Sequence, residues 1–193
     1  MESKSESRRQ LVAGAADMIR RRGVGAASIR EVAKHAQAPL GSTYHYFPGG
    51  KQQLATEAVR FAGNTVARAL DEKLRDGPVQ GLRAFLGLWR DVLIDNDFQA
   101  GCPVLAAAVE QPASEEESPV HAAAAEAFSG WRSRLADSLA QNGVDAAAAE
   151  QLATLVVAAV EGAVVLCRAR RSAEPLDHVA AQLDGLIGAN LPR

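Results

Sequence analysis

The stretch Ser28–Lys51, SIREVAKHAQAPLGSTYHYFPGGK, decides the fold of the N-terminal part of this chain. Ser28 is a good N-cap for a helix, and Glu31 completes a capping box with it. Pro39 suits the first turn of a second helix and disfavours helical backbone at Ala38, so the first helix has to end before it. About three residues remain for the turn, which is the spacing of a helix-turn-helix.

The second of these helices, over residues 39–46, is short and carries small polar side chains. Gly41 costs about 1 kcal/mol relative to alanine, which indicates that the backbone approaches a partner closely there. The tips of Tyr44 and His45 can bind phosphate oxygens, and Lys51 can share a phosphate with the free N–H groups that begin the next helix. The alternative interpretation is an ordinary helical hairpin with a solvated basic face. The predicted DNA contacts are Arg30, Leu40, Gly41, Ser42, Thr43, Tyr44, His45 and Lys51.

Charge is distributed unevenly along the chain. Residues 1–51 contain nine lysines and arginines against four acidic residues, a net charge of +5. Residues 52–193 contain twelve against nineteen, a net charge of −7. A basic first part and an acidic remainder are typical of a DNA-binding module joined to a body that does not touch DNA.

Composition favours an all-α protein, because 48% of the residues are hydrophobic, alanine dominates them and only 5% are aromatic. No apolar stretch reaches the roughly 18 residues that span a membrane, and the first residues lack the apolar core of a signal peptide. Cys102 and Cys167 have no metal-ligand spacing, which suits free thiols in a reducing cytoplasm. The four histidines form no HExxH motif, and CxxC and phosphate-binding glycine loops are lacking too. We therefore expect a cytoplasmic protein that is not an enzyme and uses no cofactor or metal.

Apolar periodicity predicts helices along the rest of the chain. Gly77-Pro78 and Asn142-Gly143 are stop signals between them, and residues 114–119 form an acidic loop and helix cap. The predicted helices cover residues 51–75, 79–95, 103–112, 119–141, 145–171 and 175–189, which makes about nine helices with those of the N-terminal part.

From Arg8 to about Val59 the chain resembles the DNA-binding domain of the TetR family of bacterial repressors. The segments RRQLVAGAADMIRRRG, EVAKHA and GSTYHYF carry the resemblance, and FPGGKQQLATEAV with GCPV at residues 101–104 resembles the LmrA/YxaF-like branch. This resemblance implies a three-helix helix-turn-helix domain over residues 1–50 and a helical ligand-binding and dimerisation domain over residues 51–193. Gln37 stands where the family has glycine in the turn, so we expect a positive φ there.

The predicted helix over residues 145–171 is apolar around most of its circumference, which exceeds what one intramolecular face needs. Together with the last helix and their symmetry mates it would form a four-helix bundle in a two-fold homodimer, as the resemblance also implies. The alternative is that both helices form the buried centre of a monomer. The predicted dimer contacts are Leu152, Leu155, Val156, Val160, Val164, Val179, Leu183 and Leu186.

Large side chains in the body are few and lie among alanines, so they could line a cavity or fill a plain core. The resemblance implies that a small, largely apolar or aromatic effector binds there and releases the protein from a palindromic double-stranded DNA operator. The alternative function is a ligand-independent architectural DNA-binding protein. The predicted effector contacts are Phe61, Asn64, Phe85, Trp89, Arg90, Phe98, Cys102, Glu110, Phe128 and Trp131.

Overall fold

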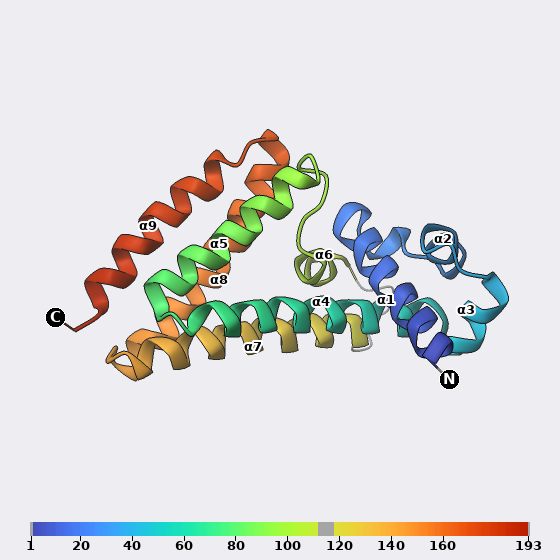
Figure 1. Cartoon of the computed structure of the whole chain (residues 1–193), viewed down its shortest axis with the longest axis horizontal. Coiled ribbons are helices and arrows are strands. Elements are labelled where there is room, and N and C mark those ends of the chain that lie inside the picture. Colours follow the sequence, from blue (N-terminus) through green and yellow to red (C-terminus); the bar gives the residue numbers. More distant parts are fainter. Residues whose placement is uncertain (1, 112–117, 193) are drawn as a thin grey trace. The chain divides into compact units, whose positions relative to one another are not determined.

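The computed structural model describes residues 2–111 and 118–192, and helices are the only regular elements in these two ranges (Figure 1). The all-α prediction is confirmed. The elements are α1 (Glu2–Arg22), the 3-10 helix η1 (Val24–Ala26), α2 (Ile29–His35), α3 (Leu40–Tyr46), α4 (Gly50–Leu74), α5 (Pro78–Asp95), α6 (Pro103–Val109), α7 (Pro119–Gln141), α8 (Ala146–Arg170) and α9 (Glu174–Asn190).

Helix α6 ends earlier than the sequence predicted. Its last helical residue is Val109, because Glu110 takes an extended conformation with ψ of 132°. The predicted end at Pro112 and residues 114–117 of the predicted acidic loop lie outside the described residues.

Packing divides the chain into two compact units. Unit 1 contains Met1–Asn64 and Cys102–Ala127, and unit 2 contains Thr65–Gly101 and Phe128–Arg193. Helix α6 joins unit 1 because it packs against α1. This division by packing differs from the expected division of the chain at residues 50 and 51.

The helix-turn-helix of unit 1 forms as its local signals require. The Ser28 hydroxyl accepts a hydrogen bond from the N–H of Glu31 at 3.2 Å, which caps α2. Gln37 adopts a φ of 52°, which confirms the expected left-handed residue in the turn. Helices α1, α2 and α3 pack on one another around Leu11, Val32 and other fully buried side chains. The motif is therefore held as one piece.

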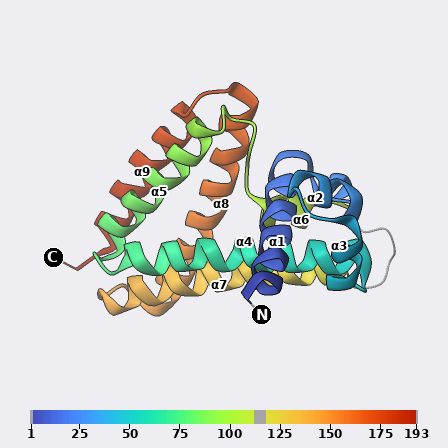
Figure 2. The same cartoon turned by 45° about the vertical axis from the view of Figure 1, so that its right-hand side comes forward.

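Helices α5, α8 and α9 form the core of unit 2, and both views show them side by side (Figures 1 and 2). Leu93, Leu176 and Ile187 are almost completely buried among them. Burial also raises the pKa of the Cys167 thiol, which keeps this sulfur protonated and unreactive.

Helix α8 is long and apolar enough to cross a membrane by length and composition, since an 18-residue window within it has a mean hydropathy of 1.9. The sequence-based expectation that no such stretch exists was therefore wrong. Helix α8 also packs against α5 and α9 within unit 2, and a helix that is apolar on most sides is typical of the centre of a folded domain.

Candidate DNA-binding surface and effector cleft

One face of helix α3 is exposed to solvent on unit 1. Leu40 and Tyr44 are 37% and 55% exposed, Gly41 and His45 also face solvent, and Ser42 is half-buried. An open backbone at residue 41 lets a partner come close, since a Cβ added there would meet no atom within 4 Å. Arg30 on α2 and Lys51 on α4 are exposed as well. The structure thus exposes or half-exposes seven of the eight predicted DNA contacts.

Thr43 is the exception, and its predicted contact with DNA is corrected here. Its side chain is fully buried, and its hydroxyl donates a hydrogen bond to the carbonyl oxygen of Pro39 at 3.1 Å. Thr43 precedes Phe47 by four residues and therefore lies on the same inward face of the helix. Phe47 is fully buried too. Thr43 is a core residue that holds α3 in place.

The short helix η1 is held from two sides within unit 1. The Lys51 ammonium donates a hydrogen bond to the carbonyl oxygen of Gly25 at 3.0 Å. The N–H of Val24 donates to the Glu110 carboxylate at 2.6 Å. Glu110 was predicted to bind an effector, but here its carboxylate binds the backbone of η1, next to the helix-turn-helix.

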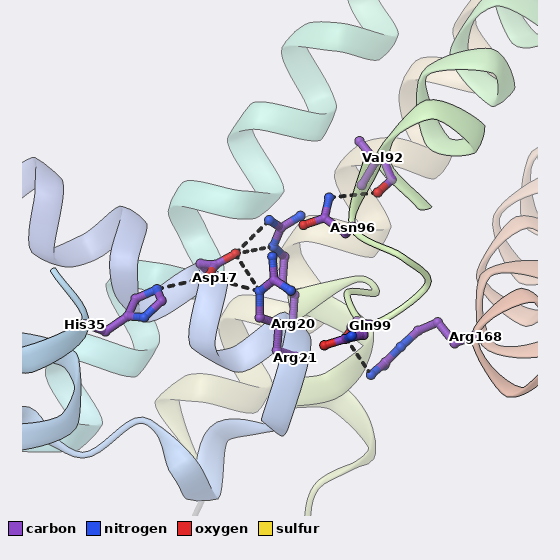
Figure 3. A network of polar contacts seen from close by, with 8 residues as sticks. All are labelled: Asp17, Arg20, Arg21, His35, Val92, Asn96, Gln99 and Arg168. Atoms are coloured by element: carbon purple, nitrogen blue, oxygen red, sulfur yellow. Dashed lines mark hydrogen bonds and ion pairs between the residues drawn. The ribbon is translucent and has the colours of Figure 1, made fainter. Parts of the chain in front are cut away.

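An ionic cluster joins α1 to the end of α2 (Figure 3). The Asp17 carboxylate accepts hydrogen bonds from Arg20 at 2.7 Å and from Arg21 at 3.2 Å, and His35 lies 2.9 Å from it on its other side. Burial raises the pKa of Asp17, but the hydrogen bonds and charges of the two arginines outweigh it, so the pKa lies below its ordinary value. The carboxylate therefore stays charged and fixes α2 against α1.

A second network joins α1 to α4 and to the turn after α3. Arg8 pairs with the Glu57 carboxylate at 2.6 Å and lies over the Phe47 ring, 5.2 Å from its centroid. Gln53 donates to Glu57 at 3.0 Å and accepts a hydrogen bond from the N–H of Gly49 at 2.9 Å. These contacts fix the turn that separates α3 from Lys51.

Unit 2 contains a cleft with almost entirely apolar walls. Three of the predicted effector contacts line it, namely Phe85, Trp89 and Trp131. The cleft leaves room for about one water molecule, so a larger ligand has to push side chains apart. The other lining residues are Val66, Leu70, Leu135, Val156, Val157, Val160 and Glu161.

The remaining predicted effector contacts do not line this cleft. Phe128 packs edge-on against Trp131, with ring centroids 5.2 Å apart. Arg90 is exposed and pairs with Asp177 at 2.9 Å, and Phe98 is in a left-handed turn with φ of 57°. Phe61, Asn64, Cys102 and Glu110 belong to unit 1.

Glu161 is the charged residue among the lining residues that were not predicted as effector contacts. Its side chain is only 7% exposed, although it carries a carboxylate. A signal was available, because Glu161 follows Val157 by four residues and precedes Val164 by three in the long apolar helix, which puts it on their face.

The predicted dimer contacts divide into two groups, and the buried group is corrected here. Leu155 and Leu186 are exposed, and Val179 is half-buried. In the buried group each side chain is at most 9% exposed within one protomer, so it packs mainly inside that protomer. It consists of Leu152, Val156, Val160, Val164 and Leu183. Val165 and Leu166 directly follow the buried Val164 in α8 and are 49% and 54% exposed, but they were not among the predicted dimer contacts.

Comparison with known proteins covers both parts of the chain. Residues 11–58 match the family described as bacterial regulatory proteins, tetR family. Residues 78–182 match the C-terminal domain of LmrA/YxaF-like transcriptional regulators. Both matches agree with the resemblance found in the sequence.

Whole-chain relatives give the same result. An HTH-type transcriptional regulator of Mycobacterium tuberculosis strain H37Rv is 42% identical over 188 residues, which cover 96% of each chain. The HTH-type transcriptional regulator LmrA of Bacillus subtilis is 29% identical, covering 96% of this chain and 98% of LmrA. In fold, the chain is similar to the regulatory protein TetR from Rhodobacter sphaeroides, with a TM-score of 0.80, 23% identity and 91% and 96% of the two chains covered. This fold and these relatives are those of transcriptional regulators.

Proposed function

Because the chain belongs to the TetR family of bacterial regulatory proteins, in its LmrA/YxaF-like branch, we propose that it is a cytoplasmic repressor released from its operator by a small, largely apolar or aromatic effector. The observation that carries this proposal is the pairing of an exposed helix-turn-helix in unit 1 with an apolar, tryptophan-lined cleft in unit 2. Regulation by a ligand requires both a DNA-binding element and a separate ligand site.

DNA binding is assigned to the exposed face of α3. Leu40, Gly41 and Ser42 lie in its first turn, where a recognition helix contacts base edges. Tyr44 and His45 supply tips for phosphate oxygens. Lys51 lies in the first turn of α4, which carries no acidic residue that would repel a phosphate. The two networks around Asp17 and Glu57 hold these residues in a fixed arrangement before DNA binds.

Dimerisation is assigned to the outer face of the packed pair α8 and α9. Leu155, Leu166 and Leu186 are exposed there, and small exposed residues such as Gly162 lie between the leucines of α8. An apolar stripe on two packed helices suits a symmetric four-helix interface, in which the same surface of each copy takes part. Two copies would present two helix-turn-helix motifs to the two halves of a palindromic operator.

The dimer can be tested separately from DNA. Leu166→Glu should shift the protein from dimer to monomer in sedimentation equilibrium, because it buries a charge in the proposed interface. Val109→Glu is the matched control, since Val109 is 74% exposed on α6 in unit 1. A Leu166→Glu variant that remains as dimeric as the control would contradict this interface.

The complete proposal is tested by footprinting the protein on DNA that flanks its own gene, followed by a screen for compounds that restore cleavage. We expect a protected palindrome whose half-sites are about one helical turn apart, and its loss with at least one apolar or aromatic compound. The architectural alternative would be supported if no compound relieved the protection of the DNA from cleavage and no compound stabilised the protein against heat. Equal affinity for all DNA sequences would contradict a specific operator.

A further inference from the structure

We propose that Glu110 is a positioning residue for DNA binding, because it fixes the backbone segment that holds the Lys51 ammonium ready for a phosphate. The inference rests on the proposed function, since it concerns the phosphate contact that is assigned there to Lys51. It adds the residue that ends α6 to the residues on which DNA binding depends. Glu110 acts through the backbone of η1 and through Lys51 rather than on the DNA itself.

The first observation is how closely the Glu110 carboxylate lies against the backbone of residues 23–25. It accepts a hydrogen bond from the N–H of Val24 at 2.6 Å, a short distance even for a charge-assisted hydrogen bond. Two glycines make this approach possible. A Cβ added at Gly23 would lie 3.3 Å from Oε2, and one added at Gly25 would lie 3.2 Å from Oε1. Both carboxylate oxygens therefore fill space that side chains at these two positions would take.

The second observation is that Lys51 binds the same backbone segment. Its ammonium donates a hydrogen bond to the carbonyl oxygen of Gly25 at 3.0 Å, and Gly25 directly follows Val24. An ammonium has three donor hydrogens, so two remain for a phosphate while one binds Gly25. By fixing residues 23–25, Glu110 also fixes the acceptor that holds the tip of the Lys51 side chain.

Holding this lysine in advance matters because its side chain is long and exposed. Immobilising such a side chain on binding lowers affinity by about 2- to 10-fold. A Lys51 side chain that is already held avoids most of this loss, and a dimer avoids it twice. The Gln53 and Glu57 network fixes the turn before Lys51. Glu110 is therefore expected to govern the tip of the side chain rather than its backbone.

The negative charge of Glu110 gives the inference a distinctive sign. An acidic residue near the DNA-binding surface repels phosphates, so its removal should by itself strengthen DNA binding. Loss of the position of Lys51 acts in the opposite direction. Weaker binding by Glu110→Ala would therefore not be an effect of the changed charge.

Fluorescence anisotropy with the operator found by footprinting measures this effect, at a temperature at which circular dichroism shows every variant folded. Glu110→Ala should weaken operator binding by about 4- to 100-fold, which is the effect of two released lysines. Glu110→Gln should regain most of the affinity, because its amide oxygen still accepts the N–H of Val24. Glu126→Ala is the matched control, since Glu126 is an exposed carboxylate of unit 1 that pairs with Arg60 at 3.6 Å. It should bind at least as tightly as the unchanged protein.

A double-mutant cycle with Lys51→Gln separates positioning from a structural role. In the Lys51→Gln background, Glu110→Ala should change the affinity by less than about 2-fold, because the side chain that Glu110 positions is gone. A structural role alone would weaken binding by the same factor in both backgrounds.

The outcomes distinguish this inference from the proposed function. The positioning role is overturned if Glu110→Ala binds as tightly as the unchanged protein, or weakens binding equally with and without Lys51. The proposed repressor and its phosphate contact stand in both cases, provided that Lys51→Gln alone weakens binding. If Lys51→Gln alone leaves the affinity and its salt dependence unchanged, the phosphate contact of Lys51 fails and the positioning role fails with it.

Discussion

Replacement of Lys51 by glutamine tests how unit 1 meets the DNA backbone. Lys51 is the second residue of α4, its side chain is exposed, and its ammonium lies 3.0 Å from the carbonyl oxygen of Gly25. Glutamine removes the positive charge, and η1 keeps the hydrogen bond from the Val24 N–H to Glu110. The change therefore removes a phosphate contact with little effect on the fold.

The size of the effect follows from counterion release. Each neutralised phosphate contributes about −0.9 to the slope of log affinity against log salt concentration. A dimer presents two copies of Lys51, so the slope of Lys51→Gln should be shallower by about 1.8. When the salt concentration rises from 50 to 200 mM, the fold-decrease in the affinity of the variant should then be about 12 times smaller than that of the unchanged protein.

Fluorescence anisotropy with labelled operator DNA at several salt concentrations measures both slopes. Lys73→Gln changes the net charge equally, but Lys73 lies in unit 2 and pairs with Glu72 at 3.1 Å. Its slope should equal that of the unchanged protein. An unaltered slope for Lys51→Gln, or the same shift in both variants, would refute the docking of Lys51 on a phosphate.

Substitutions at three further residues test the contacts that hold α3 and its neighbours in place. Thr43→Val keeps the shape of the buried side chain but loses the hydrogen bond to Pro39, so the protein should lose about 1 kcal/mol of stability. The preferred operator bases should stay unchanged. A new base preference in a binding-site selection would show that Thr43 contacts the DNA after all. Because the folded pKa of Asp17 is lowered, its contribution to stability is present above its unfolded pKa and is lost as the pH falls below the ordinary value of 3.8. Urea unfolding should therefore show Asp17→Asn to be about 1–2 kcal/mol less stable at pH 7, and this gap should close in acid; a gap independent of pH would contradict the cluster with Arg20, Arg21 and His35. Glu110→Ala should destabilise the protein by about 1–3 kcal/mol, because it removes the acceptor of the Val24 N–H. Glu110→Gln should destabilise it by less, since the amide oxygen of glutamine still accepts this hydrogen bond. Equal stability of both variants and the unchanged protein in thermal unfolding would show that the hydrogen bond contributes nothing to stability.

Helix positions could be predicted from the sequence because their signals are local. Capping at Ser28, proline at residues 78, 103 and 119, and the Asn142-Gly143 turn all act within a few residues of the element they limit. The early end of α6 could not be predicted in this way. It depends on Glu110 turning toward Val24, which is 86 residues away in the chain.

The functional surfaces were harder to predict because burial depends on tertiary packing. Thr43 is polar and lies in a polar helix, so composition assigns it to the DNA, whereas its spacing from Phe47 assigns it to the core. Glu161 posed the opposite problem, since its charge suggests a solvent-exposed position although its side chain is buried. In both cases helical spacing was the better guide than the type of side chain, since Phe47 lies four residues after Thr43 and the buried Val164 lies three residues after Glu161.

The central claim is that two symmetric copies of the protein each bind DNA through α3. A photoreactive side chain at residue 44 tests this claim most directly. Tyr44 is replaced by benzoylphenylalanine, the protein is irradiated on its operator, and the crosslinked nucleotides are mapped. The account predicts crosslinks at two symmetry-related positions about one helical turn apart, because each copy places residue 44 on its own half-site. The same group at position 186 should link two protein chains and no DNA. Absence of DNA crosslinks from position 44, or crosslinks scattered without symmetry, would contradict the account.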